Sequence, residues 1–509
     1  MLVVINYGSQ FAHLIARRVR ELGVYSEIVP SGITANRLKE MQPDGIILSG
    51  GPSSVYEKGA PLIDKGIFKF GIPILGICYG LQLIGNSFGN VDGRNVKEYG
   101  KAILHIRKKG RLLDGLGKDE AVWMSHGDSI SSLEEGFEIT ASTDTCEMAA
   151  LENNSRKIYG VQFHPEVVHT KSGMRILKNF VFSICHAKKD FTMAGMKERL
   201  IQDIKKEVMG KGVLMATSGG VDSTVAATLI HEAIGSRLHC IFIDHGLIRK
   251  GEREEVDRLY RERFENYYSV DASAPFLKKL AGISEPEQKR RIIGHTFIEV
   301  FEAKAKELKK NHPEIAFLGQ GTIYPDRIES AQPSKNASKI KSHHNLTLPE
   351  KMHLRVIEPL KELYKDNVRE LGKMLGISNH ILYRHPFPGP GLAIRILGEA
   401  TKERIQILKE ADFIFIEELK KSGYYDRVWQ AFAALFPIKS VGVMGDARTY
   451  DYIISLRAVT SVDAMTADWA RLPDSLLEKI SSRIVNEVRG VNRVVYDITQ
   501  KPPGTIEYE

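Results

Sequence analysis

The sequence of 509 residues contains few cysteines and no long apolar segment. Its four cysteines form no CxxC pair, which argues against a disulfide framework and against a cysteine zinc site. No window approaches the roughly 18 consecutive apolar residues that a transmembrane helix requires. The N-terminal segment MLVVINYGSQ lacks the charged start and the cleavage site of a signal peptide. These absences predict a cytoplasmic protein, with a first core strand at the N-terminus.

The sequence also has no block of five like charges and no Gly/Arg tract, although its net charge is +8. Such a charge has two interpretations, an RNA-binding face or a solvated surface combined with a site for phosphate-bearing small substrates. The absence of basic blocks favours the second interpretation. The length predicts about two to four domains, because one hydrophobic core does not extend over so long a chain.

Short apolar runs alternate with amphipathic segments over residues 1–185. The runs are LVVIN, YSEIVP, DGIILSGGP, IPILGIC and KIYGVQFHPE, and a helix is predicted over residues 10–22. Strand–helix alternation of this kind predicts a mostly parallel sheet with helices on both faces.

A second α/β unit begins with GVLMATSGGVDSTVAATLIHEAI, which predicts a strand, a glycine turn and a helix. Helical patterns dominate residues 252–310. Residues 330–350 are polar and lysine-rich, and they are interpreted either as a lid or as a surface insertion. After the proline-rich segment HPFPGPGLAIRI, the segments KSVGVMGD, YDYIISLRAV, LLEKISSRIVNEV and VNRVVYDI predict a small α+β module.

Cys78 lies between a predicted buried strand and a helix, within the sequence Gly76-x-Cys78-x-Gly80. This spacing is the cysteine form of a nucleophile elbow, in which glycines permit the sharp turn. The helix N-terminus favours a thiolate, because its free amides stabilise negative charge. Taken alone, the segment is equally compatible with a buried, unreactive cysteine.

Two further segments favour a catalytic thiol. SGGP at residues 49–52 follows a predicted strand and offers backbone amides for an oxyanion. His164 and Glu166, in the segment FHPE, supply a base and a carboxylate that can orient it. Together, SGGP, GICYGLQ and FHPE resemble the class I glutamine amidotransferases over residues 1–185.

This resemblance implies that glutamine is hydrolysed to ammonia by the nucleophile Cys78, the base His164 and its partner Glu166. It implies an oxyanion hole formed by the amides of Gly51 and Tyr79. The glutamine would be held by Gln82 and by the segment SHGD, which contains His126.

The segment SGGVDS follows the strand VLMAT and opens a helix, so its amides can approach phosphate oxygens. It is not a Walker A loop, because its spacing is short and no lysine follows. It resembles the pyrophosphate loop (PP-loop) of N-type ATP pyrophosphatases, which cleave ATP between the α and β phosphates and adenylate an acceptor. The resemblance places ATP on Ser218, Gly219, Gly220, Val221, Asp222, Ser223 and Thr224.

Charge developing on the phosphates would be neutralised by Mg²⁺ and by lysines. Asp326 and Glu329 are the candidate Mg²⁺ ligands, although each is also typical of a capping residue. Lys341, His343 and His344, in the segment IKSHHN, are the candidate adenylation lid, although adjacent histidines on a polar loop are usually only solvated.

An amidotransferase followed by such a loop resembles the GMP synthetase family along the whole chain, through FIDHGL, EPEQKRRIIG, QGTIYPDRIES, IKSHHN, HPFPGPGLAIRILGE, SVGVMGDARTYDYIISLRAV and KPPGTIEYE. The resemblance implies that xanthosine monophosphate (XMP) is adenylated on its C2 oxygen and aminated to GMP in purine biosynthesis. It also implies a C-terminal module that dimerises. The matching XMP positions are Arg290, Pro388, Gly389, Pro390, Lys501, Thr505, Ile506 and Glu507.

The predicted fold class is α/β, with two parallel-sheet domains and a small α+β domain. The predicted domains are a flavodoxin-like amidotransferase (residues 1–187), a Rossmann-like ATP pyrophosphatase (188–384) and a C-terminal dimerisation and XMP-binding domain (385–509). Two alternatives remain, a tRNA-modifying pyrophosphatase-loop enzyme and a non-catalytic nucleotide sensor. The first leaves the amidotransferase segment unexplained, and the second leaves the presence of Cys78, His164 and Glu166 unexplained. Neither nucleic acid nor a membrane is expected as a partner.

Overall fold

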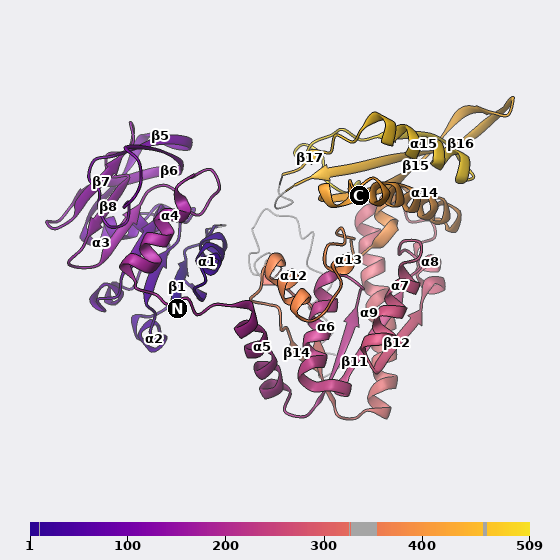
Figure 1. The fold of residues 1–509 in the computed structure, drawn as a ribbon, viewed down its shortest axis with the longest axis horizontal. Helices are drawn as coiled ribbons and strands as arrows, with labels where there is room; N and C mark the ends of the chain where they lie inside the picture. Colours follow the sequence, from indigo (N-terminus) through magenta and orange to yellow (C-terminus); the bar gives the residue numbers. More distant parts are fainter. Residues whose placement is uncertain (10, 325, 327–353, 462–465) are drawn as a thin grey trace. The chain divides into compact units, whose positions relative to one another are not determined.

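The structure is a computed structural model that describes residues 1–9, 11–324, 326, 354–461 and 466–509. The chain divides into two compact units, Met1–Gly195 and Met196–Glu509, and Figure 1 draws both. The domain boundaries at 187/188 and 384/385 remain predictions. Within the described ranges, no helix combines the length and the apolar character needed to cross a membrane.

The first unit contains a nine-stranded sheet in the order β2-β1-β3-β4-β9-β8-β7-β5-β6. The strands from β2 to β9 in this order pair in parallel, and the remaining ones pair antiparallel. The bounds are β1 (Leu2–Asn6), β2 (Ser26–Pro30), β3 (Gly45–Leu48), β4 (Ile74–Ile77), β5 (Gly89–Ile106), β6 (Asp119–Leu133), β7 (Glu138–Ser142), β8 (Ala150–Asn153) and β9 (Ile158–Val161).

Alternate residues of β1 enter two cores, one on each face of this sheet. Leu2 and Val4 pack in one core with residues of two helices, α1 (Ala12–Glu21) and α4 (Gly173–Lys178), and with η2 (Asn179–Ile184). Val3 and Ile5 pack in the other core with α2 (Ala35–Glu40), η1 (Lys65–Lys69) and α3 (Tyr79–Phe88). Period-two alternation buries both faces of the strand, and α1 lies within the predicted helix.

The second unit begins with a five-stranded parallel sheet in the order β12-β11-β10-β13-β14. Its strands are β10 (Gly212–Thr217), β11 (Leu238–Asp244), β12 (Asn266–Asp271), β13 (Ile315–Gly319) and β14 (Arg355–Ile357). Its helices are α5 (Met193–Val208), α6 (Val221–Ile234), α7 (Glu252–Arg263), α8 (Ser273–Leu280), α9 (Pro286–Asn311), α12 (Lys365–Met374) and α13 (Asn379–Leu382). Strand β12 interrupts the region in which helical patterns were expected to dominate.

The C-terminal part of this unit is a four-stranded sheet with helices. It contains η4 (Gly391–Arg395), α14 (Lys402–Lys421), η5 (Tyr425–Arg427), β15 (Gln430–Met444), β16 (Ala447–Thr460), β17 (Asp468–Trp469), α15 (Asp474–Glu487) and β18 (Val491–Tyr496). One continuous core contains Leu214 and Ile241 of the parallel sheet together with Leu408 and Leu456 of the C-terminal part. In Figure 1 the far end of the β15–β16 hairpin projects beyond the helices of this part.

Candidate active sites

Cys78 occupies the sharp turn between β4 and α3. Its backbone angles are φ 53° and ψ −108°, a region that non-glycine residues rarely adopt. The turn depends on a close approach of the chain, because a Cβ atom at Gly80 would lie 2.2 Å from the carbonyl oxygen of Leu48. The structure therefore has the predicted strand–turn–helix, with the cysteine in the strained position of a nucleophile elbow.

The loops that follow β3, β4 and β9 meet at one edge of the sheet. In the parallel register, Leu48 is paired with Gly76 and Ile77 with Val161. A Cβ atom built on Gly50 would lie 3.2 Å from Cε1 of His164 and 3.7 Å from Cβ of Cys78. The SGGP segment, the cysteine and the histidine are therefore adjacent, as their positions after parallel strands predict.

His164 and Glu166 form a buried pair. Nδ1 of His164 lies 2.7 Å from Oε1 of Glu166, and the side chains are 4% and 0% exposed. Burial acts to lower the pKa of His164, but the charge of Glu166 and hydrogen bonds with Cys78 and Glu166 hold this pKa well above 6.5. The carboxylate therefore favours an imidazolium beside the thiol, which is the protonation state of a thiolate–imidazolium pair.

The backbone around this pair is fixed by segments distant in sequence. The His164 amide donates to the carbonyl of Trp123 at 3.0 Å, and its carbonyl accepts from the Thr170 hydroxyl at 2.7 Å. Nε of Arg18 donates to the carbonyl of Glu166 at 3.0 Å. These bonds hold the loop in one conformation, as a preorganised catalytic base requires.

The amides expected to form the oxyanion hole lie at the same turn. Tyr79 is the first residue of α3, where the amide has no partner within the helix. A Cβ atom at Gly51 would lie 2.7 Å from the carbonyl of Tyr7 and 3.2 Å from the ring of Tyr79. Only glycine fits this space, which brings the backbone of Gly51 against Tyr79.

Gln82 and His126 converge on one carbonyl oxygen. Nε2 of Gln82 donates to the carbonyl of Asp128 at 3.0 Å, and Nδ1 of His126 donates to the same oxygen at 2.9 Å. The SHGD segment lies within β6, where the carbonyl of Ser125 is 3.5 Å from Sγ of Cys78. The structure therefore brings the two residues expected to bind glutamine to the side of the nucleophile.

The SGGVDS segment joins β10 to α6, as predicted. Gly219 has φ +71°, and a Cβ atom there would lie 2.5 Å from Cγ2 of Val256. The Ser218 and Ser223 hydroxyls are 3.1 Å apart, and the Thr224 hydroxyl donates to the carbonyl of Gly220 at 2.8 Å. The loop is thus a rigid turn at a helix N-terminus, which is the form that binds phosphate.

Two cations at this loop were not predicted from the sequence. Nζ of Lys365 donates to both oxygens of Asp222, at 2.8 and 2.7 Å. Nη1 of Arg384 lies 3.4 Å from the carbonyl of Gly219 and 3.2 Å from Oε1 of Glu252. In the sequence, Lys365 is recognisable only as the first residue of a helix, and nothing singles out Arg384. Only the tertiary fold shows that both lie beside the loop.

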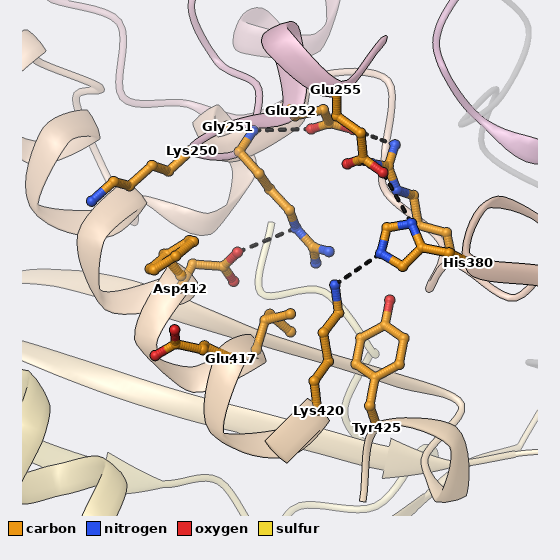
Figure 2. A pocket seen from close by; sticks show the side chains of 13 residues that line it. Lys250, Gly251, Glu252, Glu255, His380, Asp412, Glu417, Lys420 and Tyr425 are labelled. Carbon is orange, nitrogen blue, oxygen red and sulfur yellow. Dashed lines mark hydrogen bonds and ion pairs between the residues drawn. The ribbon is translucent and has the colours of Figure 1, made fainter. Parts of the chain in front are cut away.

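A cavity of about 310 Å³ adjoins Arg384, and it is drawn in Figure 2. Figure 2 shows Lys420 and His380 facing each other, with Nζ of the lysine 3.2 Å from Nε2 of the histidine. His380 also pairs with Glu255 at 3.0 Å, and Asp412 pairs with Arg249 at 3.2 Å. Charges of both signs line this cavity and are largely paired within the protein.

Glu507, one of the residues expected to bind XMP, is held by residues from distant segments. Both carboxylate oxygens of Glu507 accept from Arg395, at 2.9 and 2.8 Å. Nε2 of Gln430 donates to Oε1 of Glu507 at 2.7 Å and to the carbonyl of Pro386 at 3.2 Å. The bonds of Gln430 therefore link the C-terminal tail, which contains Glu507, to the proline-rich segment that contains Pro388, Gly389 and Pro390. Arg395 and Gln430, which are buried, were missed because each lies in an apolar sequence typical of a core.

The rest of the C-terminal tail is held by further arginines. Nη2 of Arg290 donates to the main-chain oxygen of Glu509 at 2.5 Å. Arg457 donates to the carbonyls of Thr505 and Ile506 at 2.8 and 2.7 Å. Lys501 is bonded to Ala467 through both main-chain groups. Hydrogen bonds therefore hold the C-terminal tail at several positions between Lys501 and Glu509.

The expected lid and metal residues are only partly described. Glu329, Lys341, His343 and His344 lie outside the described residues. Oδ2 of Asp326 accepts from the Ile323 amide at 3.1 Å, which agrees with the capping interpretation of this residue.

Two family models match parts of the chain. The family model described as glutamine amidotransferase class-I matches residues 3–184. The model described as GMP synthase C terminal domain matches residues 417–508.

Three curated relatives match the chain along its entire length. The glutamine-hydrolysing GMP synthase of Aquifex aeolicus (strain VF5) is 56% identical over 510 residues, covering 100% of this chain and 99% of the relative. The enzyme of the same name from Carboxydothermus hydrogenoformans is also 56% identical, with coverage of 100% and 99%. That of Brachyspira hyodysenteriae is 52% identical, with coverage of 100% and 98%.

Proposed function

Since the chain belongs to the family of glutamine-hydrolysing GMP synthases, we propose that it carries out two coupled reactions. The first unit hydrolyses glutamine to ammonia. The second unit adenylates XMP with MgATP, releasing pyrophosphate, and ammonia then displaces AMP to give GMP. The observation that carries the proposal is the presence in one chain of a buried His164–Glu166 pair beside Cys78 and of an SGGVDS turn between β10 and α6.

In the glutaminase site, the thiolate of Cys78 attacks the carboxamide carbon. The amides of Gly51 and Tyr79 stabilise the oxyanion that forms. His164 donates its proton to the departing ammonia and then activates the water that hydrolyses the thioester. Glu166 orients the imidazole and stabilises its charge, while Gln82 and His126 shape the pocket through the carbonyl of Asp128.

In the synthetase site, the SGGVDS amides and hydroxyls hold the phosphates of ATP. Residues 218–224 stand at the N-terminus of α6, whose dipole favours the anion. Adenylation converts the C2 oxygen of XMP into a leaving group. Lys365, the first residue of α12, is held beside this turn by Asp222 and can neutralise phosphate charge.

XMP binding is proposed for Arg290, Pro388, Gly389, Pro390, Lys501, Thr505, Ile506 and Glu507. Support comes from the hydrogen bonds that join Glu507, Arg395, Gln430 and the carbonyl of Pro386 into one network. The carboxylate of Glu507 already accepts three hydrogen bonds and has capacity for about one more. Glu507 therefore acts chiefly by fixing the tail, with one lone pair left for the nucleotide.

Mg²⁺ enters as MgATP, and carboxylate oxygens such as those of Asp326 are ligands it prefers. Asp326 and Glu329 as ligands, and Lys341, His343 and His344 as the lid, are proposed from the sequence segments that contain them and from the need to neutralise phosphate charge. A cytoplasmic location is also part of the proposal. The four cysteines are all free and buried, in keeping with a reducing compartment.

We further propose a homodimer formed through the C-terminal hairpin. Ile438, Val441, Val443 and Tyr450 of β15 and β16 are 61–73% exposed. Several apolar side chains grouped on one exposed hairpin are typical of an interface.

The experiment that tests this function is product analysis with XMP, MgATP and glutamine. AMP, pyrophosphate and GMP should form in equal amounts. Formation of ADP and phosphate would contradict the adenylation mechanism, and the absence of GMP would contradict the assignment as a whole.

A further inference from the structure

Three metal-ligating side chains lie together at the amino ends of the strands in the second unit. His239 is the second residue of β11, His312 follows α9, and Glu314 precedes β13. Their ligand atoms lie within 4.8 Å of one another, which holds for no other group of three or more among the described residues. We call these residues the β11–α9–β13 cluster.

The spacing within this cluster approaches that of a metal site. Nδ1 of His312 lies 3.4 Å from Oε1 of Glu314, and the His239 and His312 ring centroids are 4.4 Å apart. In a tetrahedral site with bonds of about 2.1 Å, two ligand atoms are separated by about 3.4 Å. One pair is already at this separation, and the ligand atom of His239 lies within 4.8 Å of both.

The backbone and the surroundings hold the imidazoles in place. The amide of His312 donates to the carbonyl of Leu308 at 2.8 Å, and its carbonyl accepts from Ile315 at 3.2 Å. His239 is 1% exposed, and the Tyr268 hydroxyl lies 3.4 Å from its Nδ1. In the tautomer that donates its Nδ1 proton to Tyr268, Nε2 keeps a lone pair for a metal ion.

The other two ligands are partly open to solvent. The side chains of His312 and Glu314 are 34% and 41% exposed, which gives an ion a path from solvent.

From this geometry we infer that the β11–α9–β13 cluster binds a divalent transition-metal ion through two imidazoles and one carboxylate. This donor set matches Zn²⁺, whereas Mg²⁺ and Ca²⁺ prefer oxygen ligands alone. A fourth position remains for water. The site lies at the amino end of the sheet, about 20 Å along β10 from the SGGVDS loop at its other end, so the ion would stabilise the fold and take no part in adenylation.

The test is a titration of the metal-free full-length chain with Co²⁺, whose visible absorption reports tetrahedral nitrogen and oxygen coordination. The variants are His312→Ala and Glu314→Gln. The matched control is His295→Ala, because His295 is an exposed histidine on α9, the helix that directly precedes His312. A Co²⁺ ion bound at Cys78 would contribute equally to every variant and would cancel in the comparison.

The wild type and His295→Ala should each bind one more Co²⁺ ion than His312→Ala. Zn²⁺ should displace this additional Co²⁺ ion. Glu314→Gln, which preserves side-chain size, should weaken this binding at least tenfold. Zn²⁺ should raise the thermal midpoint of the wild type and of His295→Ala but not of the two cluster variants. Equal Co²⁺ stoichiometry and spectra for the wild type, His312→Ala and Glu314→Gln would overturn the inference.

Discussion

Ile77 of β4 is paired with Val161 of the parallel strand β9. Cys78 directly follows the first of these residues, and His164 lies three positions beyond the second. Because the carboxyl ends of neighbouring parallel strands meet at one edge, this single register fixes Cys78 beside His164. The same edge carries the SGGP loop after β3, so one stretch of sheet organises the whole glutaminase site.

The His164–Glu166 pair makes the first prediction. Glu166→Gln keeps the shape of the side chain but removes the charge that raises the pKa of His164. We expect kcat for glutamine hydrolysis to fall by about 10²–10⁴, because the imidazole loses its orienting carboxylate. The measurement is ammonia release from glutamine in the presence of XMP and MgATP.

The pH dependence of glutamine hydrolysis in the same variant tests the direction in which Glu166 shifts the pKa of His164. A raised pKa keeps His164 protonated to higher pH, and this form is lost as the pH rises through the folded-state value. Glu166→Gln should therefore shift the alkaline limb of kcat/KM for glutamine to lower pH. A limb that stays in place, or that moves to higher pH, would show that Glu166 does not control the protonation of His164.

How far the sequence predicts this site depends on how local the determining contacts are. The turn at Cys78 was predictable because its glycines and flanking apolar runs lie within a few residues. The family resemblance assigned Gln82 and His126 to glutamine binding, but that both bond the carbonyl of Asp128 was not predicted, since 44 residues separate them along the chain. Periodicity carries no information about such contacts.

Lys365 makes the second prediction. Its ammonium group is held by Asp222 at the loop where the ATP phosphates are proposed to bind. Lys365→Ala should raise KM for ATP by about 10- to 100-fold in the ammonia-dependent reaction, because charge-assisted hydrogen bonds to phosphate are lost. Lys373→Ala, an exposed lysine on the same helix α12, is the control and should leave KM unchanged. Equal KM values for both variants would rule out a phosphate role for Lys365.

The fold itself shows the same limit on prediction from sequence. The two parallel sheets were predicted from alternation of strands and helices, but β12 was missed because NYYSVD lies between strongly helical segments. The extension of the first sheet by antiparallel strands was not foreseen, because the sequences of β5 and β6 mix polar and apolar residues along their length. Arg395 is fully buried in the sequence GLAIR, and only the fold brings Glu507 to it.

The exposed hairpin makes the third prediction. The double substitution Val441→Glu and Val443→Glu should convert a dimer to a monomer, because like charges would be brought into the proposed apolar interface. Met209→Glu, on an equally exposed side chain outside the hairpin, is the control and should remain dimeric. Light scattering coupled to size-exclusion chromatography measures the mass. A wild-type monomer would exclude the dimer. A dimer that persists in the double variant would show that the interface lies outside the hairpin.

The central claim, that Cys78 supplies ammonia to a separate synthetase site, is tested most directly by GMP formation in Cys78→Ala. With glutamine as nitrogen donor, the rate should fall by at least about 10³, because the nucleophile is removed. With free ammonia, XMP and MgATP, the variant should make GMP at the wild-type rate. A variant inactive with ammonia as well, or one still active with glutamine, would contradict the account.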